Sequence, residues 1–331
     1  MNSRIEYIDR LKGFAILLVV IGHFIECNVV KGYLHPLYSF IYFFHMPLFM
    51  FISGYVAKKY LKVELAKPKE AFTFINKKIR SLIIPYLTWS LLIPMCFLSY
   101  NFKFDLFSRF EYLIFHHTYL WFLTTLFYLS LLFLVYEIIS KILLKFKGGR
   151  ILCITILYIT TMFLYHIFPN VVIKSIFGYF PFYFLGVIIA QFKRAEDLYC
   201  NKIAFGIFTI AFLIIPVHFN YFETEFYRII KAIVSFAAIP TIYYLSRFMR
   251  WNTIIDNQIQ LWGRNSLVIY VTQWNLLHIF TINLPLYTST FSLILVSFIL
   301  SLFIGYACIL IGNVIKYSPI IDLLIYGRKS K

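Results

Sequence analysis

The chain is short of charged residues. Of its 331 residues, 14% are Asp, Glu, Lys or Arg, whereas 61% are apolar and 21% are aromatic. Because a soluble domain needs more charge on its surface, this composition excludes a soluble enzyme. The charges separate continuously apolar stretches of about 18 to 22 residues, the length of a helix that crosses about 30 Å of hydrocarbon. The sequence therefore predicts an all-α integral membrane protein, and the stretches lack the alternation of membrane β-strands.

Cysteine is scarce too, and linker sequence is absent. The five cysteines are Cys27, Cys96, Cys153, Cys200 and Cys308. They show no Cys-x-x-Cys spacing, so we predict neither a disulfide framework nor a metal site. No Gly/Ser-rich linker, low-complexity tract or clear internal repeat divides the chain. We expect no cleavable signal peptide, because Glu26 and Lys31 follow the first apolar run without a small-residue cleavage site. One membrane domain over residues 1–331 is the prediction.

The apolar stretches predict a bundle of about ten membrane-spanning helices. They cover residues 12–30, 37–57, 79–99, 119–139, 151–169, 173–192, 203–220, 228–246, 264–283 and 290–314. Most of the 31 Lys and Arg residues fall in alternate segments, on the side of the N-terminus. Under the positive-inside rule, both termini are therefore cytoplasmic. This orientation explains the net charge of +17 by contact with anionic membrane lipid, and we expect no nucleic-acid partner.

The first predicted span carries the densest set of ionisable groups. His23 follows Lys12 by eleven residues, which places it about 16 Å farther along the helix, near the middle of the bilayer. An ionisable group at that depth marks a functional site by default. Glu26 lies three residues later on nearly the same face, where a carboxylate can orient the imidazole. The spacing is equally compatible with a histidine that only hydrogen-bonds within the bundle and a Glu26 in the outer interface.

Two regions that follow the first span contain further candidate residues. In the second span, His45 and Ser53 flank Pro47, which indicates either a broken helix lining a cavity or a kink with close packing. In the following basic segment, Lys77 and Arg80 suit an anionic ligand such as coenzyme A. Basic segments of this kind also fix the orientation of a chain in the membrane through contact with anionic lipid.

Polar or amphipathic groups also mark the later spans. Trp121 opens the fourth span, where an aromatic residue belongs to the interfacial belt by default. Asn265 and Gln273 lie in a run of polar residues that opens the ninth span, and both are candidates to line a cavity.

Together, these motifs resemble the acyltransferase-3 family of bacterial membrane proteins, particularly its branch of fucose-4-O-acetylase-like sugar acetyltransferases. The resemblance is carried by residues 7–13 with 19–23, by residues 44–49 with 52–55, by Arg80 with residues 84–86, by residues 120–123 and by residues 263–270. It covers essentially the full length, because the family domain is itself a bundle of about ten helices.

The resemblance implies transfer of an acyl group, usually acetyl, from cytoplasmic acetyl-CoA to a hydroxyl of a cell-envelope sugar, polysaccharide or lipid-linked glycan. It implies a multi-pass protein of the bacterial inner membrane. His23 matches the family's essential histidine and is the expected general base, with Glu26 holding the imidazole. Lys12, Lys77 and Arg80 are expected to bind acyl-CoA.

The acceptor is expected to contact His45, Ser53, Trp121, Asn265 and Gln273. The chain departs from the family pattern at two of the candidate positions. Lys12 stands where many members have Arg, so it lacks the planar guanidinium fork. Gln273 stands where this branch often has His.

Three other classes of function compete with this interpretation. A transporter or flippase of a glycan or small polar solute would use His23 and Glu26 as a proton relay, but no inverted repeat is discernible. A non-catalytic partner in an envelope assembly would not need His23. An enzyme of the membrane-bound O-acyltransferase superfamily would also use a deep histidine, but its motifs match less well.

Overall fold

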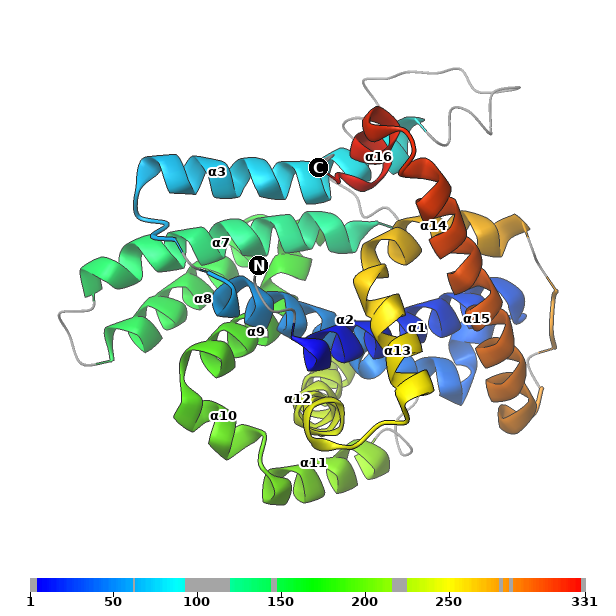
Figure 1. The fold of residues 1–331 in the computed structure, drawn as a ribbon. Coiled ribbons are helices and arrows are strands. Elements are labelled where there is room, and N and C mark those ends of the chain that lie inside the picture. The colour runs from blue at the N-terminus through cyan, green and yellow to red at the C-terminus, as the bar shows by residue number, and fades with distance from the viewer. Residues whose placement is uncertain are drawn as a thin grey trace. The chain divides into compact units, whose positions relative to one another are not determined.

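The protein is α-helical throughout the part of the chain that the structure describes. A computed structural model describes residues 5–61, 63–92, 120–143, 148–215, 225–279, 282–285 and 288–328. Within these ranges, the extended backbone pairs only in an isolated bridge between Val29 and Leu284. Figure 1 shows the helices in chain order. The predicted all-α class is confirmed for the described residues.

The elements follow one another with short connections. They are α1 (Glu6–Asn28), η1 (Gly32–Leu34), α2 (Pro36–Lys59), α3 (Pro68–Lys78), η2 (Ile79–Ile83), α4 (Ile84–Leu87), η3 (Thr88–Leu92), α7 (Trp121–Leu143), α8 (Gly149–Ile167), α9 (Val171–Gln191), α10 (Lys193–Tyr199), α11 (Lys202–Ile214), α12 (Glu225–Phe248), α13 (Thr253–Arg264), α14 (Ser266–Ile279), α15 (Thr290–Ile315) and α16 (Pro319–Tyr326). Asparagine side chains cap the starts of α9, α11 and α13, where Asn170, Asn201 and Asn252 accept hydrogen bonds from backbone N–H groups of these helices.

Six described helices are long and apolar enough to cross a membrane: α2, α7, α8, α9, α12 and α15. The pair α10 and α11, bent by 52°, makes a seventh if it forms one broken span. The chain is therefore a multi-pass membrane protein, but the predicted number of ten spans is not reached within the described residues. Two predicted spans, 79–99 and 203–220, run past those residues, and α14 is only 14 residues long.

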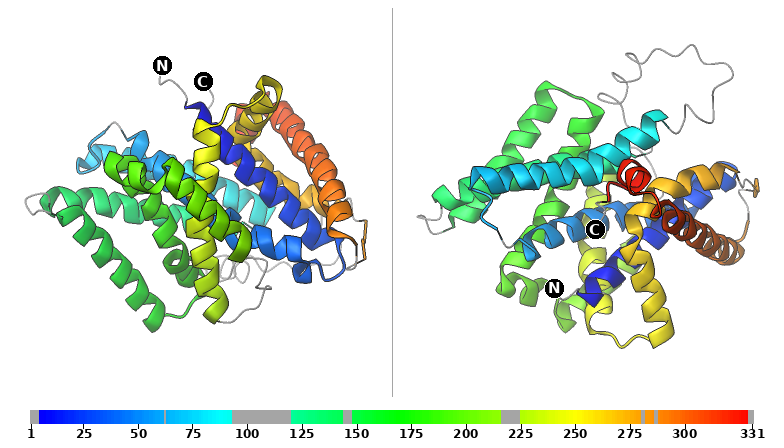
Figure 2. Two further views of the ribbon diagram at one scale, coloured as in Figure 1. Left: turned by 90° about the horizontal axis from the view of Figure 1, so that it is seen from below. Right: turned by 45° about the horizontal axis from the view of Figure 1, so that its top comes forward.

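The chain divides into two compact units, each built from separate stretches of sequence. The first contains residues 1–52 and 188–313, and the second contains residues 53–187 and 314–331. In the first unit α1 packs against α12, α13 and α14, as Figures 1 and 2 show. Gly13 and Gly263 form the crossing of α1 and α13, because a Cβ on either glycine would overlap a backbone carbonyl oxygen of the other helix. Two glycines thus set the distance between these helices.

In the second unit α7 packs on α8, α3 contacts α7, and α16 packs against α4 and η3. The π-helical segments η2 and η3 flank Pro85, whose missing N–H interrupts the regular hydrogen-bond ladder. Gly327 ends α16 with φ of +63°. A Cβ at this position would overlap the carbonyl oxygen of Arg80, so the backbone of Gly327 packs closely against that of Arg80. The indole of Trp89 donates to the carbonyl of Ile325 at 3.0 Å. These contacts attach the C-terminal helix to the segment that contains Arg80.

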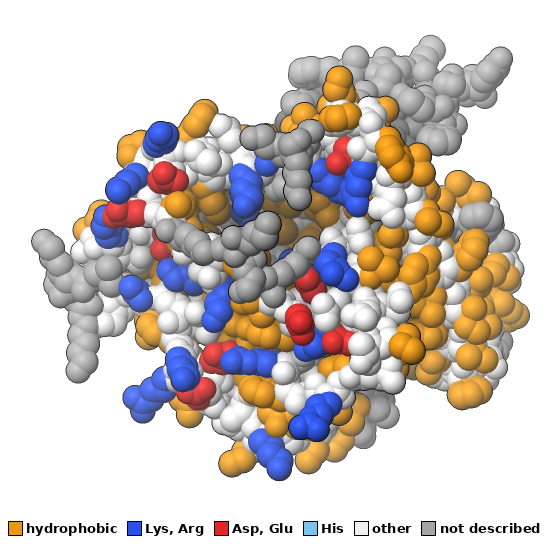
Figure 3. Space-filling view, viewed as in Figure 1, with side chains coloured by type: hydrophobic (Ala, Val, Ile, Leu, Met, Phe, Trp, Pro, Cys, Tyr) orange, Lys and Arg blue, Asp and Glu red, His pale blue; other side chains and the backbone are white. Residues whose placement is uncertain are grey.

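Several helices present apolar side chains outward. In α15 the large residues Phe291, Ile299 and Phe303 are exposed, and only 33% of its apolar window is buried. For α8 the buried share is 17%. Figure 3 shows apolar side chains gathered over α15. In water such a surface would drive aggregation, so these faces suit contact with lipid.

Candidate functional site

His23 lies on α1 and contacts α14 in the first unit. The amide nitrogen Nε2 of Gln273 is 3.1 Å from His23 Nδ1. The ring of Trp274 meets the imidazole edge-on, with 5.2 Å between ring centroids and 88° between ring planes. Gln273 is fully buried and His23 is partly exposed. The imidazole is therefore held on one side by an amide and an indole, with part of its surface open.

Gln273 can serve either tautomer of His23. A half turn about the last side-chain bond exchanges the amide oxygen and nitrogen. With the oxygen toward the ring, Gln273 accepts a hydrogen bond from Nδ1–H, and the lone pair of Nε2 is available to take a proton. Oε1 of Gln273 is buried and has no hydrogen-bond partner among the described residues. After the rotation, this oxygen accepts a hydrogen bond from Nδ1–H of His23. The rotation therefore favours the tautomer that a general base needs, with the lone pair on Nε2.

Glu26 has a different partner from the predicted one. The hydroxyl of Tyr42 donates to Oε2 of Glu26 at 2.6 Å. Tyr42 also stacks on Tyr38, with ring centroids 3.7 Å apart, and its ring lies against Gly22. Thus the hydrogen bond expected between Glu26 and His23 is replaced by one from α2. Gln273, and not Glu26, contacts the imidazole, because α14 packs against α1 at that turn.

His45 contributes a second buried imidazole from α2. Its side chain is 2% exposed, and its Nδ1 lies 2.7 Å from the carbonyl oxygen of Ile41. Since a carbonyl can only accept, Nδ1 carries the proton and Nε2 holds a lone pair. The ring of His45 lies edge-on to that of Tyr42, with 4.7 Å between centroids. The structure therefore gathers His23, Gln273 and His45 in one unit.

Lys12 and Asn265 belong to the same unit but occupy other positions. Lys12 is on α1, and its spacing from His23 corresponds to about 16 Å of helix. Asn265 ends α13, and its side-chain nitrogen donates to the carbonyl of Leu261 at 2.9 Å. The observed contact of Asn265 is thus a cap on its own helix.

Ser53, Lys77, Arg80 and Trp121 belong to the second unit. Ser53 precedes Gly54, where a Cβ would overlap the carbonyl oxygen of Tyr183. Trp121 begins α7 and stacks on Tyr179 at 5.2 Å between centroids. Both residues therefore lie at close helix contacts.

Arg80 has the features expected of an anion-binding group. It lies in the π-helical segment η2, one turn after Lys77 at the end of α3. Its Nε is buried and has no hydrogen-bond partner among the described residues. A buried guanidinium nitrogen is costly without an acceptor, and a phosphate oxygen of acyl-CoA is a suitable one. The residues present therefore fit an anionic ligand at this segment.

An ion pair between Arg10 and Asp256 was not foreseen from the sequence. Nη2 of Arg10 lies 2.7 Å from Oδ2 of Asp256, and Nη1 donates to the carbonyl of Ser246 at 3.2 Å. The hydrogen bond from Arg10 lowers the pKa of the Asp256 carboxyl. The pair ties the start of α1 to α13. The two residues are 246 positions apart in the sequence, so no local sequence pattern predicts the pair.

Among the described residues, no group of three or more His, Cys, Asp or Glu side chains is arranged to hold a metal ion.

Comparison with known proteins identifies the family. The sequence model of an acyltransferase domain matches residues 5–310, which span both units. The chain belongs to the acyltransferase-3 family. The resemblance inferred from the motifs is thereby confirmed at the level of the family.

Two relatives carry the name nodulation protein NolL. The protein from Sinorhizobium fredii (strain NBRC 101917 / NGR234) is 30% identical over 201 residues, which cover 57% of this chain and 50% of the relative. The protein from Mesorhizobium japonicum (strain LMG 29417 / CECT 9101 / MAFF 303099) is 37% identical over 97 residues, or 28% of this chain and 24% of the relative. The chain thus spans at most half the length of these relatives, and no solved structure matches it.

Proposed function

We propose that this protein is a membrane-bound O-acyltransferase of the bacterial inner membrane. It moves an acyl group, acetyl in the first instance, from cytoplasmic acyl-CoA to a hydroxyl of a cell-envelope sugar, polysaccharide or lipid-linked glycan. One observation carries the proposal. In a chain of the acyltransferase-3 family, His23 of α1 faces α14, its Nδ1 lies beside Gln273, and its side chain is partly exposed.

His23 acts as the general base. Nε2 takes the proton of the acceptor hydroxyl as the hydroxyl oxygen attacks the thioester carbonyl. A new ester C–O bond forms, the C–S bond breaks, and the departing thiolate receives the proton from the imidazolium. A positioned base of this kind is worth about 10² to 10⁴ in rate. Gln273 orients the ring throughout, because its amide stays beside Nδ1.

The remaining candidates take supporting roles in this proposal. Lys12, Lys77 and Arg80 bind the phosphates of acyl-CoA, with Arg80 as the best supported because of its buried Nε. His45, Ser53, Trp121, Asn265 and Gln273 line the path of the acceptor. Glu26 contributes through Tyr42, whose hydroxyl donates a hydrogen bond to the Glu26 carboxylate. In the proposed topology, with about ten spans and both termini in the cytoplasm, the basic segment 58–80 lies on the side of the donor.

Transfer of isotope-labelled acetyl from acetyl-CoA tests the function. Membranes that contain the native chain, His23→Ala or the control His166→Ala are incubated with extracted envelope glycans and glycolipids, and the products are identified by mass spectrometry. His166 is an exposed histidine near the end of α8, so its replacement leaves transfer intact. Label on a glycan with the native chain and the control, but not with His23→Ala, supports the proposal. Equal labelling in all three membranes refutes the role of His23.

A further inference from the structure

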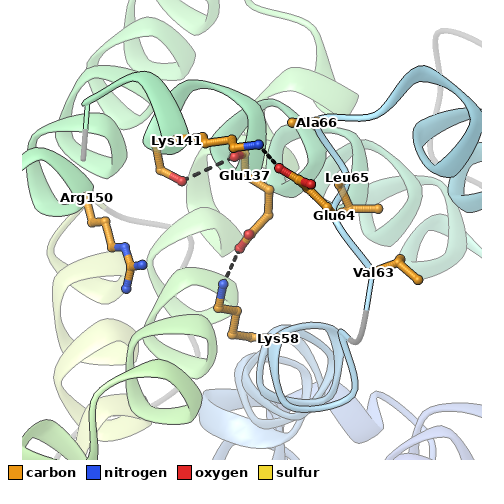
Figure 4. Close-up of a pocket in the computed structure, with 9 residues that line it drawn as sticks. Lys58, Val63, Glu64, Leu65, Ala66, Glu137, Lys141 and Arg150 are labelled. Atoms are coloured by element: carbon orange, nitrogen blue, oxygen red, sulfur yellow. Dashed lines mark hydrogen bonds and ion pairs between the residues drawn. The ribbon is translucent and has the colours of Figure 1, made fainter. Parts of the chain in front are cut away.

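A charged cavity of about 180 Å³ lies within the second unit, and its lining includes none of the site residues assigned above. It forms where α2 and α7 end and α8 begins (Figure 4). The residues that line it are Lys58, Val63, Glu64, Leu65, Ala66, Glu137, Ser140, Lys141 and Arg150. All of them lie on the side that the distribution of Lys and Arg predicts to be cytoplasmic.

The lining contains three cations and two carboxylates. Lys58 donates to Glu137 at 2.6 Å, and their side chains are only 20% and 15% exposed. Lys141 pairs with Glu64, but these side chains are 55% and 40% exposed. An exposed pair of this kind is worth about 0 to 1 kcal/mol, so Glu64 is easily displaced. In Figure 4 Arg150 stands across the cavity from Glu64. The three cations outnumber the two carboxylates, so the lining as a whole is net positive.

The neighbours of these cations along the chain are apolar and exposed. Ile138 and Ile142 flank Lys141 on α7, and Ile151 and Leu152 follow Arg150 on α8. Both helices are among those able to span the membrane. A polar, net positive cavity thus adjoins helix surfaces that face hydrocarbon. Basic pockets between spans on the cytoplasmic side bind the phosphate groups of anionic lipids, with the acyl chains along the helices.

We propose that this cavity binds the phosphate of an anionic phospholipid headgroup. Arg150 and Lys141 contact the phosphate, and the lipid chains lie along Ile142 and Ile151. Glu64 pairs with Lys141, and the lipid phosphate displaces it from there. The chemistry recognised is a phosphate ester with attached acyl chains. The proposal is independent of the acyl-transfer site.

Native mass spectrometry of the purified full-length protein in neutral detergent tests this proposal. The protein is titrated with phosphatidylglycerol or phosphatidylcholine, and bound lipids are counted. We expect Arg150→Gln to weaken phosphatidylglycerol binding about fivefold, the equivalent of about 1 kcal/mol for one basic residue. Glu64→Gln has the opposite effect, a gain of several-fold, because Lys141 is released for the phosphate. Such a gain cannot come from misfolding.

The matched control is Lys69→Gln, which removes one exposed positive charge from α3 in the same unit, outside the cavity. It leaves phosphatidylglycerol binding unchanged, and no variant alters phosphatidylcholine binding. The proposal is overturned if Arg150→Gln and Glu64→Gln both bind phosphatidylglycerol like the native chain. It is also overturned if soluble glycerol 3-phosphate competes as strongly as the lipid, since the site would then take a free phosphate ester.

Discussion

At the scale of single residues, the contact between Gln273 and His23 decides how the imidazole is used. A neutral side chain beside Nδ1 orients the ring without adding charge, so the base strength of Nε2 depends on its surroundings. A carboxylate in that position would stabilise the imidazolium and make the proton harder to return to the leaving group. Gln273 therefore supplies a neutral hydrogen-bonding partner at this position.

Replacement of Gln273 tests this role. We expect Gln273→Leu to lower kcat for acyl transfer about 10- to 100-fold, which matches the roughly 1–3 kcal/mol cost of a buried group left without its partner. The KM for acyl-CoA is expected to stay the same, because the proposed role of Gln273 is to orient His23 and to line the path of the acceptor. Steady-state kinetics with labelled acyl-CoA measure both constants. Gln258→Leu, which removes an amide bonded to Tyr306 on the same unit, serves as control. A rise in KM with unchanged kcat would contradict the role.

Glu26 is expected to matter much less than His23. The carboxylate of Glu26 accepts a hydrogen bond from Tyr42, and a neutral amide oxygen still accepts this bond. We therefore expect Glu26→Gln to keep the rate of transfer within about threefold of the native rate. Rates of labelled acetyl transfer for Glu26→Gln and Tyr42→Phe provide the comparison. A loss of activity as large as that of His23→Ala would contradict this expectation and would show that Glu26 orients the imidazole of His23.

At the scale of elements, the crossing of α1 and α13 is set by the absence of two side chains. Gly13→Ala is expected to lower the free energy of unfolding by about 1–3 kcal/mol, because the new Cβ overlaps the carbonyl oxygen of Ile259. Gly206→Ala on α11 is the matched control, since no other atoms lie near its Cβ and alanine favours helix. Thermal unfolding in detergent measures both. Equal midpoints for the two variants would show that the crossing relaxes freely.

The pair of Arg10 and Asp256 gives the same crossing a dependence on pH. Because the folded-state pKa of Asp256 is lowered, its contribution is fully present above the unfolded pKa of about 3.9 and is lost as pH falls through the folded value. We expect Asp256→Asn to unfold at a lower temperature than the native chain from pH 7 down to about 4, with the difference shrinking at lower pH. A difference that grows on acidification would contradict this assignment.

At the scale of the whole molecule, the orientation in the membrane can be tested separately from the chemistry. In a variant without native cysteines, a cysteine at Lys69 is expected to react with an impermeant maleimide only after the membrane is permeabilised. A cysteine at Lys174, at the start of α9, reacts in intact cells. The reason is that Lys and Arg are retained on the cytoplasmic side. Labelling of position 69 in intact cells would reverse the proposed topology and would place the basic segment away from the donor.

The prediction of the fold succeeded where the signal was local. The apolar stretches at 37–57, 119–139 and 290–314 correspond to α2, α7 and α15 within a few residues. It was less successful where polar residues interrupt a span. The stretch 264–283 corresponds to the 14-residue α14, because Asn265 separates that helix from α13. The division into two units also has no counterpart in the sequence pattern, since each unit draws on separate stretches of chain.

The sequence by itself determined that this is a helical membrane protein of the acyltransferase-3 family with a histidine deep in its first helix. Hydrophobic burial is summed over neighbouring residues, so composition and helix length reveal it directly. Only the tertiary structure decided the partners of that histidine and of Glu26. Gln273 is 250 residues from His23, and Tyr42 reaches Glu26 from the next helix. Hydrogen bonds act over about 3 Å in space, so their partners depend on helix packing and not on position along the chain.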